Sequence, residues 1–175
     1  MIIISHRKVN QLEAKKMIDK IKTTPNIVGY TIKEWLNCEH IIVAEDEGGQ
    51  LLGACLNYDF AESWTKIAAL YVFEEFRGRG IGKALFYESF NDAMKRHKNV
   101  YTISRNPTII KMMNELEFTT FNSLLNFPDQ FKSDQLDFYT HSLQWLLSPF
   151  RIKEIVRKQI TFSSQQIFVY GLKSV

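Results

Sequence analysis

The sequence predicts an α/β fold in which helices cover a mixed β-sheet, and three observations support this. Two apolar segments, 41–44 and 50–60, flank the polar turn Glu45-Asp-Glu-Gly-Gly49, as in an antiparallel hairpin. A third apolar segment, 63–73, precedes a glycine-rich stretch, a helical pattern and the apolar segment 100–104. Because a helix joins them, 63–73 and 100–104 should be parallel strands linked by a right-handed crossover.

The first forty residues predict one strand and two helices. Residues 2–5 are a short apolar strand. Asn10 and Glu13 have the spacing of a capping box, and apolar residues then recur at helical spacing, which predicts a helix over 11–22. A second short helix is expected over 31–37.

The segment after the third strand continues the alternation of helices and strands. A helix is expected over 82–97, with strand 100–104 behind it. Pro107 suits the first turn of a helix over 107–116. Residues 118–127 are then predicted to form another strand.

The tail predicts two helices and a last strand. A helix begins near Lys132, with Ser133 or Asp134 as its cap, and a second helix covers 151–159. The last strand is expected over 167–172. Residues 128–160 therefore form a helical insertion between the last two strands. The first of the two helices carries five apolar residues on one face: Leu136, Tyr139, Leu143, Leu146 and Leu147.

Length and composition fit one domain over residues 1–175, since domains commonly hold about 100–150 residues. With 45% hydrophobic residues the chain has enough apolar side chains for a core. No apolar run approaches the roughly 18 residues of a membrane span. Two cysteines, Cys38 and Cys55, make no disulfide framework, which fits a reducing cytoplasm. The net charge of +3 is evenly mixed, so nucleic-acid binding is not called for.

The stretch Arg77-Gly-Arg-Gly-Ile-Gly82 predicts an anion site between a strand and a helix. The first N–H groups of a helix lack partners, and glycines let an anion approach the backbone. The stretch is not a Walker loop, because Ala84 follows Lys83 where serine or threonine is required. It is not a dinucleotide fingerprint either, because Leu85 replaces the third glycine.

The segment Leu70-Tyr-Val-Phe-Glu-Glu-Phe-Arg-Gly-Arg-Gly-Ile-Gly-Lys-Ala-Leu85 resembles the acyl-coenzyme A signature of the GNAT N-acetyltransferase superfamily. A weaker match, Asn106–Phe118, is similar to the segment that follows the fifth strand in these enzymes. The resemblance covers roughly residues 1–127 in element order. It implies a GNAT-like fold, with a partly splayed mixed sheet of six to seven strands flanked by helices.

The resemblance also implies where acetyl-coenzyme A (acetyl-CoA) binds as co-substrate, with no metal. Backbone N–H groups of the loop would hold its pyrophosphate: Arg77, Gly78, Arg79, Gly80, Ile81, Gly82 and Lys83. The pantetheine arm would pair with the backbone of Leu70, Tyr71 and Val72, where the two parallel strands splay apart. An N–H near Val72 would serve as an oxyanion hole. Asn106 would contact the arm, or only cap its helix.

The residues expected to act as acid and base depart from the pattern of the GNAT family. Relatives carry a carboxylate on one of the two parallel strands, whereas here Glu62 and Asp59 lie at a strand connection, either acting through water or simply solvated. The tyrosine that usually protonates the departing thiolate is matched by Met113, which cannot donate a proton. Tyr101 or Ser104 would substitute, or the thiolate would leave unaided, or the protein would bind acyl-CoA without efficient turnover.

The sequence thus predicts a cytoplasmic N-acetyltransferase that moves an acetyl group from acetyl-CoA to a primary amine by direct attack in a ternary complex. The alternatives are a non-catalytic acyl-CoA sensor or interaction module of the same fold, and a basic module for nucleic acid or another partner. The amine would be a small molecule or peptide. The insertion would wall the amine pocket or form a homodimer face, and its aromatics would pack in the core or line an apolar pocket: Phe127, Phe131, Phe138, Tyr139 and Trp145.

Overall fold

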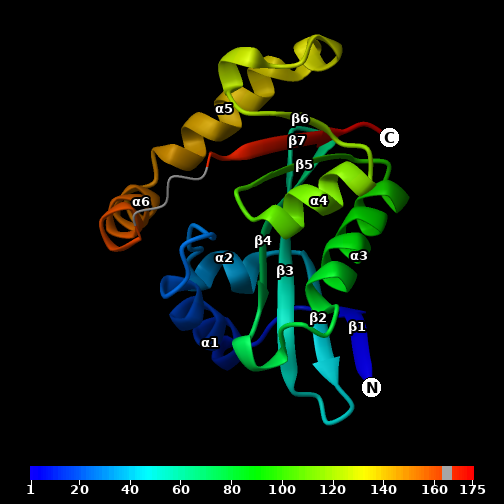
Figure 1. Cartoon of the computed structure of the whole chain (residues 1–175), viewed down its shortest axis with the longest axis vertical. Helices are drawn as coiled ribbons and strands as arrows, with labels where there is room; N and C mark the ends of the chain where they lie inside the picture. Colours follow the sequence, from blue (N-terminus) through cyan, green and yellow to red (C-terminus); the bar gives the residue numbers. More distant parts are fainter. Residues whose placement is uncertain (163–166) are drawn as a thin grey trace.

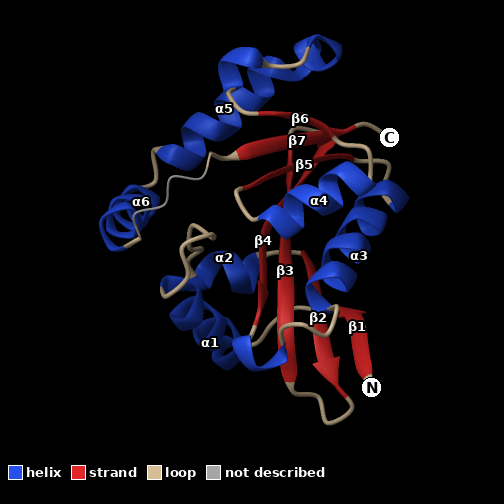
Figure 2. Cartoon of the chain, viewed as in Figure 1, coloured by secondary structure: helices blue, strands red, loops and turns tan. Residues whose placement is uncertain are grey.

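A computed structural model of the chain describes residues 1–162 and 167–175. In these residues a seven-stranded mixed sheet has the order β1-β2-β3-β4-β5-β7-β6, with helices on both faces (Figures 1 and 2). The strands are β1 (Ile2–His6), β2 (His40–Asp46), β3 (Leu51–Phe60), β4 (Trp64–Val72), β5 (Asn99–Ser104), β6 (Thr119–Phe121) and β7 (Val169–Lys173). The α-helices are α1 (Gln11–Lys22), α2 (Ile32–Asn37), α3 (Ile81–Lys95), α4 (Pro107–Glu115), α5 (Gln135–Leu146) and α6 (Pro149–Thr161).

The predictions for the N-terminal part are confirmed. The Asn10 side chain accepts a hydrogen bond from the Glu13 N–H at 2.9 Å, and the Glu13 carboxylate accepts one from the Asn10 N–H at 2.8 Å. This capping box starts α1. Strands β1 to β4 pair antiparallel in chain order, and β4 pairs parallel with β5, as the helical crossover requires.

Three groups of buried side chains hold the layers together. One lies between the sheet and α1 and α2, and includes Met17, Trp35 and Phe73. A second lies on the opposite face under α3 and α4 (Figure 1). The third is an aromatic cluster that the insertion helps to build: Trp64, Tyr101, Phe121, Phe127, Phe131, Phe138 and Leu172.

The predicted strand over 118–127 is wrong in length. Strand β6 covers only Thr119–Phe121, and a 3₁₀ turn follows over Leu124–Asn126. The Ser123 hydroxyl accepts a hydrogen bond from the Leu125 N–H at 3.2 Å, a local alternative to strand pairing. Helices α5 and α6 lie between β6 and β7 in the chain, where the insertion was predicted.

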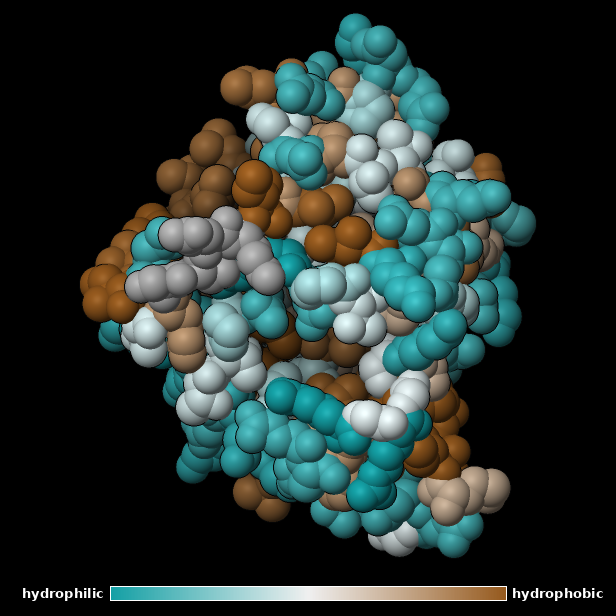
Figure 3. Space-filling view, viewed as in Figure 1, coloured by the Kyte–Doolittle hydropathy of each residue, from teal (hydrophilic) through white to brown (hydrophobic). Residues whose placement is uncertain are grey.

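The predicted apolar face of α5 exists, but it is exposed. Its residues continue into an apolar row on α6, and Figure 3 shows hydrophobic surface on this side of the molecule. Phe127, Phe131 and Phe138 are core residues, as expected, whereas Tyr139 is 38% exposed. The exposed row consists of Leu136, Leu143, Leu146, Leu147, Ile152, Val156 and Ile160. None of the helices in residues 1–162 and 167–175 has the length and apolar character needed to cross a membrane.

Candidate functional site: the fork between β4 and β5

The glycine-rich loop leads from β4 into the first turn of α3. Gly78 and Gly80 both have a φ of +78°, a left-handed conformation in which most side chains are strained. The first hydrogen bond inside α3 runs from the Ala84 N–H to the Gly80 carbonyl at 3.0 Å. The N–H groups of the three residues before Ala84 therefore lack helix partners, and no acidic residue occupies this turn. The turn is suited to an anion.

Three cations flank the loop, and they differ in the contacts that their side chains make with other groups of the protein. Lys83 Nζ lies 3.1 Å from a Glu115 carboxylate oxygen. Arg77 donates from Nε to the Val72 carbonyl at 3.1 Å, which ties its guanidinium to the end of β4. Arg79 is exposed, lies over the Phe76 ring, and makes a long contact of 3.5 Å to a backbone carbonyl. Arg79 is thus the loop cation most available to a ligand.

The sheet forks between β4 and β5 just ahead of this loop. The parallel pairing spans Trp64–Ile67 and Asn99–Thr102 and stops there, although both strands run on. At the last pair, the Thr102 hydroxyl donates to the Ile67 carbonyl at 3.1 Å. Beyond this point β5 continues to pair with β7, so the strands separate as the sequence predicted.

The edge of β4 beyond the fork presents backbone groups to the gap. The Phe73 N–H donates to the Leu52 carbonyl at 3.0 Å, on the β3 side. Successive residues of a strand direct their N–H and C=O groups to alternate sides, so Val72 and Leu70 direct theirs to the fork. Arg77 binds the Val72 carbonyl. The Val72 N–H and both groups of Leu70 are therefore placed to pair with an extended ligand chain.

On the sheet face opposite α3 lies a cluster of buried cations. Lys66 of β4 is 5% exposed and Arg151 of α6 is 8% exposed. The Lys66 Nζ lies 4.9 Å from the centre of a Trp145 ring and 5.3 Å from that of Tyr101. The Arg151 guanidinium carbon lies 4.9 Å from the same Trp145 ring. Trp145 thus contacts both cations, and we call this group the cation cluster.

The charges of the cation cluster are only partly balanced. Arg151 forms a salt bridge with Glu34 of α2, whose carboxylate also accepts a hydrogen bond from the Thr31 N–H at 2.7 Å. Within the described residues, Lys66 has no hydrogen-bonding or anionic partner. Several polar atoms around it are buried without a partner in the same part of the chain: Tyr58 Oη, His141 Nε2, Trp145 Nε1 and Arg151 Nε.

These surroundings shift the basic groups toward their neutral forms. Burial, with added repulsion from Arg151, lowers the pKa of Lys66 to about 7. Burial lowers the pKa of His141 to about 4, with Lys66 and Arg151 contributing repulsion. At neutral pH, His141 is therefore uncharged and Lys66 is divided between its two protonation states.

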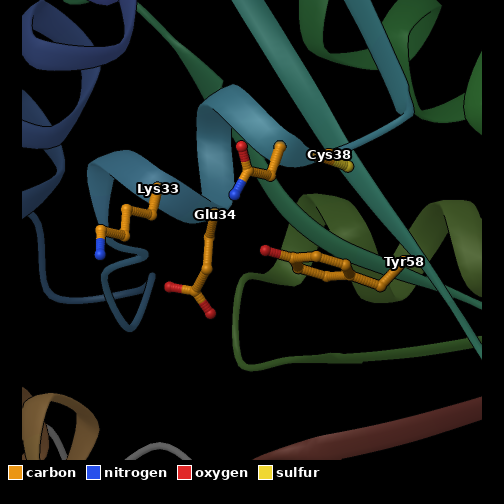
Figure 4. A pocket seen from close by; sticks show the side chains of 5 residues that line it. Lys33, Glu34, Cys38 and Tyr58 are labelled. Atoms are coloured by element: carbon orange, nitrogen blue, oxygen red, sulfur yellow. The ribbon is translucent and has the colours of Figure 1, made fainter.

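Two shallow pockets adjoin the cation cluster. Tyr58, the cross-strand neighbour of Lys66, points its hydroxyl toward α2 in the first pocket (Figure 4). That pocket has a volume of about 200 Å³ and is lined by Lys33, Glu34, Asn37, Cys38 and Tyr58. The second has about 130 Å³ and is lined by Phe60, Ala61, Asp137, Thr140, His141 and Gln144. No cluster of His, Cys, Asp or Glu in the described ranges is placed to hold a metal ion.

Comparison with known families decides what this arrangement is. The family model described as an acetyltransferase (GNAT) domain matches residues 37–123, a range that contains the glycine loop and both strands of the fork. The chain belongs to the GNAT superfamily. The resemblance inferred from the loop is therefore confirmed. No curated protein matches the sequence.

Several solved structures share the fold of this chain. N-acetylglutamate synthase from Neisseria gonorrhoeae, complexed with coenzyme A and N-acetyl-glutamate, has a TM-score of 0.62 and 17% identity; the match covers 99% of this chain but only 36% of the synthase. Rv2747 from Mycobacterium tuberculosis, in complex with coenzyme A, has a TM-score of 0.64 and 12% identity, covering 96% and 97% of the two chains. The ribosomal-protein-S18-alanine N-acetyltransferase from Escherichia coli has a TM-score of 0.59 and 13% identity, covering 100% and 96%.

Two predicted residues of this GNAT chain lie beside the fork on the β5 side. Asn106 caps α4, its side chain accepting from the Thr108 N–H at 2.9 Å. The Ser104 hydroxyl oxygen accepts from the Asn106 N–H at 3.1 Å, which leaves the hydroxyl proton free to be donated. The capping alternative for Asn106 is confirmed, and its contact with the cofactor stays a prediction.

The other predicted catalytic residues of the GNAT chain are not brought together. Tyr101 is buried against Phe60 and Phe138, and burial raises the pKa of its hydroxyl. It pairs with Lys66 immediately before the fork. Glu62 is exposed in the turn between β3 and β4, at the end of β4 remote from the glycine loop. The structure therefore groups Tyr101 with the cation cluster and leaves Glu62 apart.

Met113 fills the core where other GNAT members usually carry a tyrosine. It belongs to α4 and is fully buried between this helix and the sheet. Its sulfur would lie 3.2 Å from a Cβ placed at Gly171, so there is little spare room on that side. Packing thus accounts for methionine at this position.

Most of the cation cluster could not be predicted from the sequence. Lys66 carried one signal, since it is a lysine within the apolar strand segment 63–73, and Trp145 was expected only to pack in the core or line an apolar pocket. His141 and Arg151 carried no signal, because nothing local shows that the insertion returns to β4.

Proposed function

We propose that this GNAT chain is an N-acetyltransferase that moves the acetyl group of acetyl-CoA to a primary amine by direct attack in a ternary complex. One observation carries the proposal: two parallel strands separate directly ahead of a helix N-terminus whose first N–H groups are free. The first feature admits an extended arm between the strands, and the second binds a diphosphate at its end.

The loop and the β4 edge bind different parts of acetyl-CoA. The backbone from Arg77 to Lys83 holds the pyrophosphate, with Arg79 as the freest added cation. Leu70 and Val72 pair with the amides of the pantetheine arm. Tyr71, whose backbone faces β3, keeps this edge fixed in the sheet.

The chemistry needs one bond made, one broken and two proton movements. The amine nitrogen attacks the thioester carbonyl carbon, the C–N bond forms, and the C–S bond breaks. The Leu70 N–H, which faces the gap two residues nearer the fork than Val72, donates to the carbonyl oxygen as negative charge develops on it. The thiolate takes a proton from water or from Ser104, although a thiol with a pKa near 8.5 also leaves without help. The nitrogen gives its proton to water, with Glu62 as a more distant acceptor.

A substitution in the loop tests this function. Gly82→Asp places a negative charge in the phosphate seat, and the normal backbone φ of Gly82 lets the helix accept a side chain. We expect acetyl-CoA affinity in a calorimetric titration to fall about 100-fold, a loss near 3 kcal/mol. Asn91→Asp adds the same charge to an exposed position of α3 and should leave the affinity unchanged.

Thiol release with a panel of amines completes the test. Unchanged affinity in a folded Gly82→Asp protein would refute the binding site. Tight acetyl-CoA binding with no thiol released from any amine would instead identify a non-catalytic acyl-CoA-binding module.

A further inference from the structure

The cation cluster lies beside the fork, where the amine must meet the thioester. Lys66 and Tyr101 form the pair next to the last one before the strands separate, so Lys66 lies about 3–7 Å along β4 from the fork. The Tyr30 hydroxyl reaches the Ala68 carbonyl, one residue past the last pair. The cluster therefore lies where the acceptor would bind, and not at the loop that would bind the diphosphate.

We propose that Lys66 and Arg151 bind a carboxylate of the acceptor, so that the substrate is a small amine carrying a carboxylate group. This inference rests on the proposed function and extends it to the class of acceptor. The groups around Lys66 are Tyr58 from β3, Tyr101 from β5, His141 and Trp145 from α5, and Arg151 from α6, with Glu34 and Tyr30 in contact with Arg151.

The charge balance of this group favours an anionic ligand. Glu34 is its acid, and Arg151 already binds it. A buried ammonium without a counter-ion is unfavourable, and an arriving carboxylate would supply that counter-ion to Lys66. A polyamine or other purely cationic acceptor would be repelled at the same place.

The free hydrogen-bond donors suit the oxygens of a carboxylate. Trp145 Nε1 and Arg151 Nε are buried N–H donors that lack a partner at hydrogen-bond distance in the described residues, although the Tyr30 hydroxyl lies beside both side chains, and the Tyr58 hydroxyl is equally unpaired. Buried polar groups that have no hydrogen-bond partner within a protein are usually paired with a bound ligand, ion or water. The two pockets, of about 200 and 130 Å³, flank the cluster, the first at Glu34 and Tyr58 and the second at His141.

The decisive experiment compares L-amino acids with their carboxamides as acceptors: alanine, leucine, phenylalanine and glutamate, each against its α-amide. Each pair differs mainly in the negative charge. The amine of an amide is the less basic of the two, so amine basicity alone would favour the amide. We expect kcat/KM to be at least about 10-fold higher for the carboxylate form of the preferred amino acid.

Lys66→Met keeps the length and apolar stem of the side chain but removes its charge. We expect the variant to lose the preference, because its KM for the acid rises about 10-fold and approaches that for the amide. Lys16→Met is the matched control, because Lys16 is an exposed lysine over the Phe73 ring on the α1 side. Acetyl-CoA affinity should be unaltered in both variants.

Each other outcome has a definite meaning. Equal use of acids and amides by the unmodified protein would overturn the proposal, and so would an equal loss of kcat for both forms in Lys66→Met, which would mark Lys66 as the proton acceptor. If no amine is acetylated, titration of the amino acids in the presence of coenzyme A still decides. Binding that Lys66→Met abolishes would support the carboxylate site even though the proposed transfer reaction had failed, and absence of binding would refute it.

Discussion

The two sides of the fork hold their positive charges in opposite ways. On the cofactor side, Arg79 extends from a glycine-fixed loop into solvent. On the acceptor side, Lys66 and Arg151 are buried beneath helices inserted between β6 and β7. The first arrangement belongs to the part of the chain that the GNAT family model matches, whereas Arg151 lies outside it. The difference suggests that the cofactor site is general and that the inserted helices supply selectivity for the acceptor.

The largest expected effect tests whether the insertion is anchored on the acceptor side. Lys158 of α6 is buried and donates hydrogen bonds to three backbone carbonyls at and just after the end of α1, those of Ile21, Thr24 and Ile27. Lys158→Met removes all three bonds, although the Ile21 carbonyl still accepts from the Thr24 N–H, and should lower the free energy of unfolding by about 3 kcal/mol, measured by urea denaturation. Lys153→Met, on the exposed side of the same helix, should change it by less than about 0.5 kcal/mol. Equal stability of the two variants would contradict an anchored insertion.

The sequence could predict features formed by neighbouring residues, but not the contacts that the anchored insertion makes with distant parts of the chain. The glycine loop is a local device, since a strand, two left-handed glycines and a helix start are adjacent in the chain. The cation cluster joins Lys66 to residues about eighty positions later, and no periodic pattern in the sequence predicts a contact over that separation. The apolar face of α5 was predicted from spacing, yet spacing alone cannot distinguish a buried face from the exposed one that the structure shows. The prediction of a strand over 118–127 was wrong because the Ser123 hydroxyl accepts a local hydrogen bond from the Leu125 N–H.

The second prediction concerns pH and Lys66. An unfolded lysine has a pKa near 10.4, whereas the pKa of Lys66 in the folded protein is about 7. Between these values the unfolded chain binds more protons, so Lys66 makes the free energy of unfolding rise with pH from about 7 to 10. Lys66→Met removes this contribution. It should be more stable than the unmodified protein by about 2 kcal/mol at pH 7, with a smaller difference at pH 9.5.

Urea denaturation at pH 7, 8 and 9.5 measures this difference. Removal of the Lys66 charge also raises the pKa of His141, which titrates below this range and leaves the comparison intact. A constant difference across the three pH values would show that Lys66 is not held in a charge-disfavouring site.

A smaller effect is expected at the cofactor side of the core. Met113→Tyr enlarges a fully buried side chain next to Gly171 and should lower the free energy of unfolding by about 1 kcal/mol. Acetyl-CoA affinity should stay within about threefold, because the glycine loop and β4 edge are unchanged. Thermal unfolding and calorimetry check the two halves, with the volume-conserving Met113→Leu as control. A large loss of affinity would place Met113 in contact with the cofactor instead of the core.

The smallest effect separates the two sides most directly. Screening by salt acts on exposed charges and much less on buried ones, since the Debye length falls from about 10 Å at 0.1 M to about 3 Å at 1 M. Acetyl-CoA affinity should therefore weaken about threefold between 0.1 and 0.5 M NaCl, and Arg79→Met should weaken it at low salt and reduce this dependence. The preference for an amino acid over its amide should change less than about twofold over the same range, because Lys66 and Arg151 are shielded from the solvent. Loss of the preference for the amino acid at high salt, with unchanged acetyl-CoA affinity, would mean that exposed cations select the acceptor. The contrast between the two sides would then be wrong.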